Sequence, residues 1–246
     1  KSSVISEICL DCVESGSKVT AFSGELSPQN FMRWMNLQAA GKTHAEPTQF
    51  EGYYNVAKEN QEKIAEWLDK NFTLYNNKYG NDFLAVKEQL ERKIEADKPN
   101  LLILDNLMAF DIRSLSENKF EAQTAFTWSL HEMAQKYDIH IVFVAHPRKA
   151  MGFLRLDDIS GTADIGNAFI IHRVNNDFIR LTKQMFGWKD DDPLYSADNV
   201  IEIAKDRDGG LQDYFIPLYY EKESKRLKNS FAENKIYGWD KQEDGF

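Results

Sequence analysis

The sequence comprises 246 residues with a formal net charge of −9, and 42% of the residues are hydrophobic. Such a chain is long enough for one α/β domain with a sizeable core. With only 13 glycines and six prolines it is not a low-complexity chain, and no apolar run approaches the roughly 20 residues of a membrane-spanning helix. The acidic charge also excludes a generally basic nucleic-acid-binding domain, so any such contact must come from a local patch or from a pore shared between subunits.

Helices and short strands alternate through residues 1–145. The helical segments place apolar residues at three- and four-residue spacing, and the strands are short runs of apolar and β-branched residues. Ser27 followed by Pro28 is typical of a helix start, because serine caps the first turn and proline fits its first position. The expected helices cover 2–14, a segment from 28, 55–69, a segment from 83 that is closed by Lys98-Pro99-Asn100, and about 117–137, and the expected strands cover 18–23, 72–75, 101–105 and 139–145.

The last third of the chain is richer in strands. A polar insertion at 176–199 and an acidic tail after residue 230 indicate no role. Alternating strands and helices followed by consecutive strands predict an α/β fold, in which a mainly parallel central sheet is flanked by helices and carries an antiparallel C-terminal extension. We expect a single domain over 1–246, with 221–246 as its C-terminal tail. The expected strands of this part are 168–174, 200–205 and 213–220.

The apolar strand LLILD ends in Asp105. In open α/β sheets ligands bind at the carboxyl ends of the strands, so the residues that follow each strand are the candidates for a site. Four apolar residues followed by aspartate form the Walker B pattern, in which the carboxylate holds Mg²⁺ through its water shell. The alternative is an aspartate that only caps a turn or a helix.

The chain opens on Lys1, Ser2 and Ser3, at the start of the expected helix 2–14. A lysine followed by a serine ends the phosphate-binding loop G-x-x-x-x-G-K-[ST]. There the lysine contacts the β- and γ-phosphates, the hydroxyl holds Mg²⁺ and the helix N-terminus faces the anion. We therefore expect the chain to begin within that loop, with its glycines upstream. Without Asp105 as a partner, a lysine at a terminus would be only a solvated charge.

A hydrolase also needs a group that positions or deprotonates water. Many ATPases with a phosphate-binding loop place a second carboxylate directly after the Walker B aspartate, but here that position is Asn106, which cannot accept a proton. Glu25, just past the strand 18–23, is the nearest substitute if the two strands are neighbours. The alternative is an exposed glutamate near a helix start, where the helix dipole favours negative charge.

Two later strands end in further candidates. His146 follows the strand 139–145, where a histidine can bind a γ-phosphate and report its loss to the adjoining loop, although a histidine in this position can also be merely structural. Lys205 and Arg207 follow the strand 200–205 in a glycine-rich turn. An arginine presented there suits a finger that reaches a neighbouring subunit's nucleotide. The Asp-Gly pair in the same turn is also an ordinary hairpin signal, and the two interpretations are compatible.

Together these residues resemble the RecA-like motor domain of DnaB-family replicative helicases, and within the family the branch of phage primase-helicases and the mitochondrial replicative helicase. The resemblance covers about residues 1–220. It rests on the stretches KSS, FSGELS, LLILDN, VFVAHPRK, ISGTADIGNAFIIHRV and IEIAKDRDGG, which follow the family's order and approximate spacing. The roles that it implies are nucleotide binding by Lys1, Ser2 and Ser3, Mg²⁺ binding by Ser2 and Asp105, catalysis by Glu25, phosphate sensing by His146, and contacts from Lys205 and Arg207 to the next subunit's nucleotide.

The segment between His146 and Asn167 corresponds, by the same resemblance, to the loops that grip single-stranded DNA in the channel of a hexamer. Basic side chains and a turn of small residues suit contacts with phosphates. Asp157 and Asp158 dilute the basic character, so an ordinary solvated loop is the alternative. The predicted DNA-binding residues are Arg148, Lys149, Arg155, Ser160, Gly161 and Thr162.

The resemblance thus predicts an ATP-dependent replicative helicase motor that uses ATP and Mg²⁺, translocates on single-stranded DNA and unwinds duplex as a hexameric ring. A primase domain or a primase is expected as a further partner, and no membrane contact is expected. The expected location is the cytoplasm of a bacterial or phage-infected cell, with mitochondria as an alternative. Two other functions stay open: a RecA-like ATPase or ATP-gated oligomer that does not unwind DNA, and a degenerate module that only binds or loads DNA.

Overall fold

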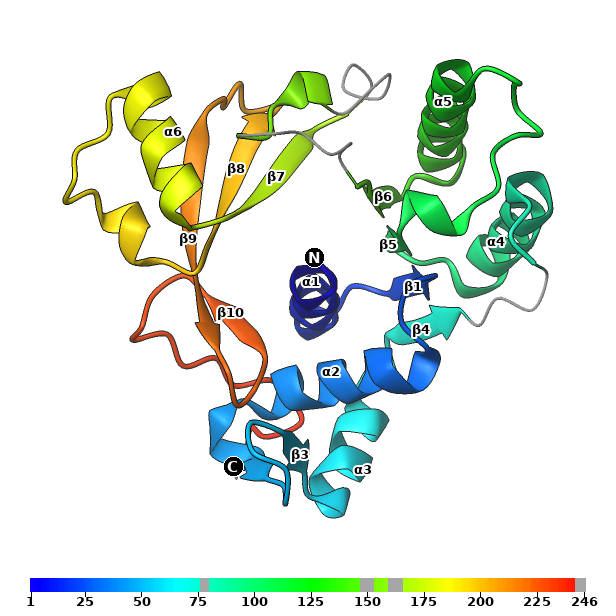
Figure 1. The fold of residues 1–246 in the computed structure, drawn as a ribbon. Coiled ribbons are helices and arrows are strands. Elements are labelled where there is room, and N and C mark those ends of the chain that lie inside the picture. The colour runs from blue at the N-terminus through cyan, green and yellow to red at the C-terminus, as the bar shows by residue number, and fades with distance from the viewer. Residues whose placement is uncertain (76–79, 147–152, 159–165, 242–246) are drawn as a thin grey trace.

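The computed structural model describes residues 1–75, 80–146, 153–158 and 166–241 of the chain. Their strands form two four-stranded sheets and a short hairpin. The first helix, α1 (Ser2–Glu14), lies between the two sheets (Figure 1). Within the described ranges, no helix combines the length and the apolar character needed to cross a membrane.

The first sheet is entirely parallel and has the strand order β4-β1-β5-β6. Helices cover both of its faces, as expected for strands joined by helical crossovers. Its strands are β1 (Val19–Ser23), β4 (Phe72–Tyr75), β5 (Leu101–Asp105) and β6 (His140–Val144), and its helices besides α1 are α2 (Pro28–Ala40), α3 (Lys58–Leu68), α4 (Phe83–Asp97) and α5 (Lys119–Tyr137).

Two apolar clusters hold these layers together. On one face of the sheet, α1, α2 and α3 pack on side chains such as Ala21 and Ile103; on the other face, α4 and α5 pack on Leu102 and Leu104. All five residues of β5 are buried, which confirms the prediction of a strand enclosed on both faces. Because β5 lies between β1 and β6 and carries Asp105 at its end, a strand buried along its whole length positions that carboxylate.

Strand β6 differs from the prediction of a second buried strand. Its residues are only half-buried, and His140 is exposed. The reason is its place in the sheet, because among the described strands β6 is at the edge and pairs only with β5. An apolar sequence shows that a strand enters a core, but it does not show whether the strand is central or at an edge.

The second sheet is antiparallel and has the order β10-β9-β8-β7. The predicted α/β class, with a parallel central sheet and an antiparallel C-terminal part, is confirmed, and the antiparallel strands make a sheet of their own. Its strands are β7 (Ala168–Arg173), β8 (Asn199–Lys205), β9 (Tyr214–Glu221) and β10 (Arg226–Lys228).

The segment 176–199, which the sequence presents as a polar insertion, contains a helix. This helix, α6 (Asn176–Phe186), is capped by Asn175 and ends at Gly187. It packs on the second sheet through an aromatic cluster that includes Phe178 and Trp188. The insertion therefore supplies part of the core of the second sheet. Its apolar residues recur at helical spacing, but the polar and charged residues between them hide this pattern in the sequence.

Short elements fill the connections. The hairpin consists of β2 (Ala45–Pro47) and β3 (Tyr54–Val56). It occupies the start of the region predicted as helix 55–69, so that helix, α3, begins three residues later than expected. The 3₁₀ turns among the described residues are η1 (Lys42–His44), η2 (Leu107–Ala109), η3 (Leu156–Asp158) and η4 (Pro193–Ser196).

The C-terminal segment, which the sequence leaves without a role, docks on α1. The Tyr237 side chain is fully buried, and its hydroxyl lies 2.8 Å from a carboxylate oxygen of Asp11. Lys235 pairs with the same carboxylate at 2.8 Å. The Trp239 indole N–H donates to the carbonyl of Ala39 at the end of α2. Residues 226–241 thus join the ends of both helices.

Candidate active site

Three neighbouring parallel strands end at one edge of the first sheet. Ser23 of β1 is in register with Asp105 of β5, and Asp105 is in register with Val144 of β6. The residues just past these positions therefore lie side by side, as do Glu25 and His146. The N-terminus of α1 meets the same edge, because the Ser2 hydroxyl donates to Asp105 Oδ2 at 3.0 Å.

Asp105 is the most enclosed group of the site, with no exposed surface. Burial raises the pKa of its carboxyl group, and the hydrogen bond from Ser2 opposes that rise. The second carboxylate oxygen, Oδ1, is buried and has no hydrogen-bond partner among the described residues. A buried, unpartnered carboxylate oxygen beside a serine hydroxyl fits the water shell of Mg²⁺, which prefers oxygen ligands.

Lys1 places its ammonium group at the N-terminus of α1. Its Nζ lies 2.8 Å from His146 Nδ1 and 3.4 Å from the carbonyl oxygen of Ala145. Burial lowers the pKa of the Lys1 side chain, while the charges of Glu25 and Asp105 act in the opposite direction. A cation beside the unsatisfied N–H groups of a helix N-terminus is suited to an anion such as a phosphate.

Asn106 connects the carboxylate and the imidazole of the site. It is buried, its side-chain N–H₂ donates to Glu25 Oε2 at 2.9 Å, and the same nitrogen lies 3.1 Å from His146 Nε2. Its Oδ1 accepts from the backbone N–H of Met108, which fixes the orientation of the amide. Sequence reasoning treated Asn106 only as a missing base. Its position at the end of β5 was the signal that it lies in the site.

The contacts of His146 cannot all be satisfied at once. Lys1 offers only hydrogens to Nδ1, and Asn106 offers hydrogens to Nε2, whereas a neutral imidazole has one acceptor nitrogen. The Glu25 carboxylate faces the same side of the ring, but its Oε2 lies 3.7 Å from Nε2, beyond hydrogen-bond distance. The neutral imidazole can therefore accept from Lys1 or from Asn106, but not from both.

Lys205 and Arg207 lie on the other sheet. Lys205 ends β8, and Arg207 is exposed in the turn that leads to β9. The Arg207 backbone N–H donates to Asn167 Oδ1 at 2.9 Å, and Gly210 has a φ of 68°, so the turn uses the left-handed conformation that glycine adopts easily. The predicted hairpin at the Asp-Gly pair is present. The predicted contact with a neighbouring nucleotide stays a prediction.

Of the predicted DNA-binding residues, Arg155 alone belongs to the described part of the chain. It is exposed, and its backbone N–H donates to Asp158 Oδ2 at 2.8 Å. Asp158 in turn donates its backbone N–H to the Arg155 carbonyl, so two hydrogen bonds between these residues hold the η3 turn together. The others, Arg148, Lys149, Ser160, Gly161 and Thr162, lie outside the described residues.

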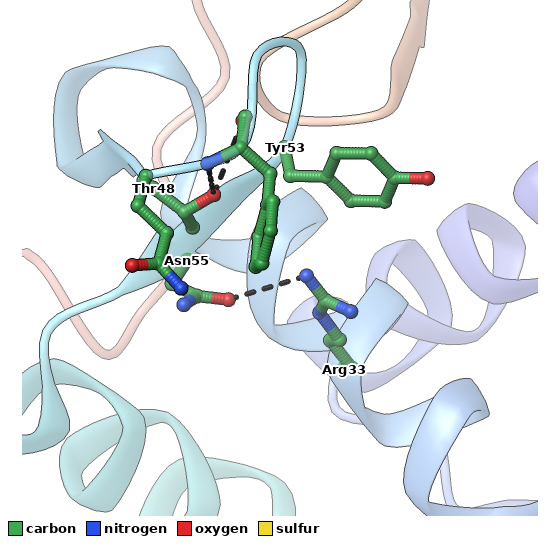
Figure 2. A pocket seen from close by; sticks show the side chains of 6 residues that line it. Arg33, Thr48, Tyr53 and Asn55 are labelled. Carbon is green, nitrogen blue, oxygen red and sulfur yellow. Dashed lines mark hydrogen bonds between the residues drawn. The ribbon is translucent and has the colours of Figure 1, made fainter.

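A cavity of about 680 Å³ opens elsewhere, between α2 and the β2–β3 hairpin. Figure 2 shows the Arg33 guanidinium pointing toward the Asn55 side chain, which it contacts at 3.3 Å, while the Tyr53 ring extends outward. Phe50, on the same hairpin, is also exposed. None of the predicted site residues lines this cavity, so it is separate from the cluster at the strand ends.

Comparison with known families shows that this chain belongs to the AAA domain family. The AAA domain family AAA_25 matches residues 1–152, which contain all of the strand-end cluster. No functionally curated protein matches the sequence.

Two solved structures share the fold. The first, an ATPase domain, has a TM-score of 0.65 and 15% identity, and the match covers 92% of this chain and 79% of that one. The second, a DnaB-like replicative helicase solved in a study of its interactions with primase, has a TM-score of 0.63 and 14% identity, with 89% of this chain and 52% of that chain covered. This chain thus spans about half the length of the second neighbour. The predicted fold is confirmed, because the chain shares it with this DnaB-like helicase, and the closer likeness to phage primase-helicases and the mitochondrial helicase stays a prediction.

Proposed function

We propose that this chain, which belongs to the AAA domain family, is the ATP-hydrolysing motor domain of a replicative DNA helicase that translocates on single-stranded DNA as a ring. The observation that carries the proposal is the meeting of Lys1, Ser2, Glu25, Asp105 and His146 at one edge of the parallel sheet. That edge is where α/β sheets bind ligands. The fold shared with an ATPase domain and with a DnaB-like helicase supports the same assignment.

Nucleotide binding falls to the start of α1. Lys1, Ser2 and Ser3 would hold the phosphates of ATP, with the ammonium group and the helix N-terminus facing the anion. Ser2 and Asp105 would hold Mg²⁺, since a hydroxyl and a buried carboxylate with one unpartnered oxygen lie 3.0 Å apart there. Bound Mg²⁺ supplies neutralisation of the phosphate charge.

Glu25 is the group that would accept a proton from the attacking water. Its carboxylate is exposed at the mouth of the site and is held from one side by the Asn106 amide. Asn106 thus positions the base without competing for its proton. His146 would contact the terminal phosphate. Because the neutral ring can accept from only one of Lys1 and Asn106, loss of the phosphate would let it change partner.

Lys205 and Arg207 complete the site of the neighbouring subunit in this proposal. Their place on a separate sheet, in an exposed turn, suits a contact in trans. Single-stranded DNA would bind to the segment that contains Arg148, Lys149, Arg155, Ser160, Gly161 and Thr162, and in a hexamer this segment would face the central channel. A primase is the proposed further partner, because the DnaB-like neighbour was solved in a study of that interaction. The location in the cytoplasm of a bacterial or phage-infected cell, with mitochondria as the alternative, stays a prediction.

The test is ATP hydrolysis by the full-length protein, measured with and without single-stranded DNA. We expect DNA to stimulate turnover, and Glu25→Gln to lower the stimulated rate by roughly 10²- to 10⁴-fold, the usual size of a general-base contribution. Glu51→Gln, a change of an exposed glutamate on the β2–β3 hairpin, is the matched control and should behave as wild type.

Each other result selects a different function. Turnover that ignores DNA would replace the helicase with an ATP-gated oligomer. Binding of nucleotide and DNA without any turnover would leave a loading module. Equal losses in Glu25→Gln and Glu51→Gln would remove Glu25 from the reaction.

A further inference from the structure

A buried glutamine lies behind the nucleotide-binding turn. Gln38 is in the last turn of α2 and has no exposed surface. Its side-chain N–H₂ donates to the carbonyl of Ser3 at 2.8 Å and to the carbonyl of Lys225 at 3.1 Å. Its Oε1 lies 2.5 Å from the Ser6 hydroxyl, which donates to it. Every polar atom of this amide therefore has a partner, and the three partners come from two other parts of the chain.

The surroundings permit only one orientation of the Gln38 amide. Both groups that face its nitrogen, at Ser3 and Lys225, are carbonyls and can only accept. Turning the amide over would place its oxygen against these two carbonyl oxygens. In a buried setting, such a loss of two hydrogen bonds with the addition of repulsion is unfavourable. The side chain is thus a fixed three-way connector rather than a filler of space.

The three connected segments are those that the proposed reaction uses. Ser3 belongs to the first turn of α1, beside Ser2, whose hydroxyl binds Asp105. The helix that carries Gln38 begins at Pro28, directly after the turn that contains Glu25. Lys225 lies between β9 and β10, in the sheet whose other strand ends carry Lys205 and Arg207.

Arg226 strengthens the same junction. Its guanidinium is buried and donates to three backbone carbonyls, those of Gln38 at 2.6 Å, Ala39 at 3.1 Å and Lys235 at 2.6 Å. A cation at the C-terminus of α2 is also favoured by the helix dipole. Gly41 ends the helix with a φ of 65°, and a Cβ there would come within 3.0 Å of the Arg226 guanidinium. Backbone and side chain of Gln38 are therefore both tied to the turn at 225–226.

We propose that Gln38 is a positioning residue for nucleotide turnover. Its amide fixes the phosphate-binding turn of α1 relative to both Glu25 and the second sheet, so that the nucleotide contacts and the contacts in trans keep one geometry. This inference rests on the proposed function. The residue touches no substrate. It acts through Ser3, Ser6 and Lys225.

The experiment compares Gln38→Leu with Thr182→Val in the full-length protein. Leucine keeps the volume of the side chain but leaves the Ser3 and Lys225 carbonyls without their donor. Thr182 is an equally buried polar residue of α6, bonded to the Phe178 carbonyl at 2.8 Å and far from the proposed machinery in the fold. Three quantities are measured: affinity for a fluorescent ATP analogue, DNA-stimulated turnover, and melting temperature.

A displaced phosphate-binding turn should weaken catalysis more than folding. We expect DNA-stimulated turnover of Gln38→Leu to fall about 10- to 100-fold, the cost of a misplacement on the order of 1 Å, together with weaker binding of the analogue. Thr182→Val should lose melting temperature but keep both functional quantities. Unchanged turnover and affinity in Gln38→Leu would overturn the proposal, as would an equal functional loss in Thr182→Val.

A second variant keeps the test decisive if Gln38→Leu does not fold. Ser6→Ala removes the hydroxyl that faces Gln38 Oε1 and that also lies 2.9 Å from the Ser2 carbonyl oxygen and 3.2 Å from that of Ser3, and alanine favours the helix. It should shift turnover in the same direction with a smaller size, and wild-type behaviour would contradict the proposal. If the wild-type protein itself lacks turnover, the proposed function fails, while the affinity measurement on the Gln38 and Ser6 variants still decides whether this amide positions the nucleotide turn.

Discussion

The two sheets of this protein are built on different physical plans. In the parallel sheet, β5 is buried along its whole length, helices cover both faces, and the polar groups gather at one edge. In the antiparallel sheet, one face packs on the aromatic cluster of α6, while Phe169, Tyr214 and Tyr220 remain exposed. Lys205 and Arg207 lie at the end of this second sheet and not in the cluster at the edge of the first.

In the proposed function, this difference separates two tasks. The parallel sheet fixes the catalytic groups, and the antiparallel sheet offers side chains to another subunit. A doubly covered sheet fixes carboxylate, hydroxyl and ammonium groups relative to one another, because the strands cannot shift without breaking two cores. A sheet with an open face can offer side chains to another molecule. Helix α1 lies between the two sheets, and it contacts β1 on one side and the C-terminal segment on the other.

The largest expected effect concerns Arg207, in the turn that follows β8 of the second sheet. Arg207→Ala should lower turnover by about 10³- to 10⁵-fold, the range for an arginine finger, because charge on the transferred phosphate would lose its partner. Binding of ATP should be nearly unchanged. Steady-state hydrolysis and a binding assay measure the two quantities.

Arg173→Ala is the control for that change. Arg173 is also exposed and lies at the opposite end of β7 and β8, paired with Asn199. It should behave as wild type. If Arg207→Ala retains normal turnover, Arg207 does not contribute to catalysis, and the proposed contact from the second sheet to a neighbouring subunit's nucleotide is wrong.

The next effect compares the covered face of the parallel sheet with the open face of the antiparallel sheet. Phe126 of α5 is fully buried, with its ring 4.6 Å from that of Phe83 and 5.7 Å from that of Phe110. Phe126→Ala should lower the free energy of unfolding by about 3–5 kcal/mol through lost contacts and the cavity that remains. Phe169→Ala, on the open face of β7, should change it by less than about 0.5 kcal/mol. Urea unfolding followed by circular dichroism compares them, and similar losses would contradict the open-face description.

Glu7 of α1, the helix between the two sheets, predicts a dependence of stability on pH. Burial raises the pKa of Glu7 to about 7, the charge of Asp11 adds to the rise, and a hydrogen bond from the Leu227 N–H opposes it. In the folded state Glu7 thus holds its proton at a pH where the unfolded chain has lost it. The free energy of unfolding should therefore fall as pH rises from about 4.5 to about 7, by roughly 3 kcal/mol from this group.

Glu7→Gln isolates that contribution. Its unfolding free energy should be flatter between pH 4.5 and 7 than that of the wild type, since glutamine does not titrate. Glu51→Gln, an exposed change, should keep the wild-type slope. Parallel slopes in all three proteins would show that Glu7 does not titrate in this window.

The smallest effect concerns DNA. Replacing Arg148 and Lys149 with alanine should weaken binding of single-stranded DNA and reduce the slope of log affinity against log salt by about 0.7 for each lost phosphate contact. Binding titrations over a series of salt concentrations measure this slope. Replacing Lys58, an exposed lysine at the start of α3, serves as the control. A slope that does not change would assign the DNA contact to another segment.

Local sequence was sufficient for most of the elements. The strands 72–75 and 101–105 and the helix 2–14 have the predicted bounds, because runs of apolar residues and regular spacing are local signals. The helix α6 was missed, since its charged and polar residues outnumber the apolar ones that face the aromatic cluster. The exposure of β6 was also missed, because a strand's place in a sheet depends on its neighbours rather than on its own residues.

The same division applies to the site. Asp105, Glu25 and His146 could be selected from sequence, because each follows a strand and strand ends gather ligands. The contacts of Asn106 could not, since they depend on where Glu25 and His146 lie. Nor could those of Gln38, whose partners Ser3 and Lys225 are far apart in the chain. Sequence by itself determined which residues are capable of chemistry. Only the tertiary structure decided which of them are partners, because hydrogen bonds between distant residues depend on how the elements pack together.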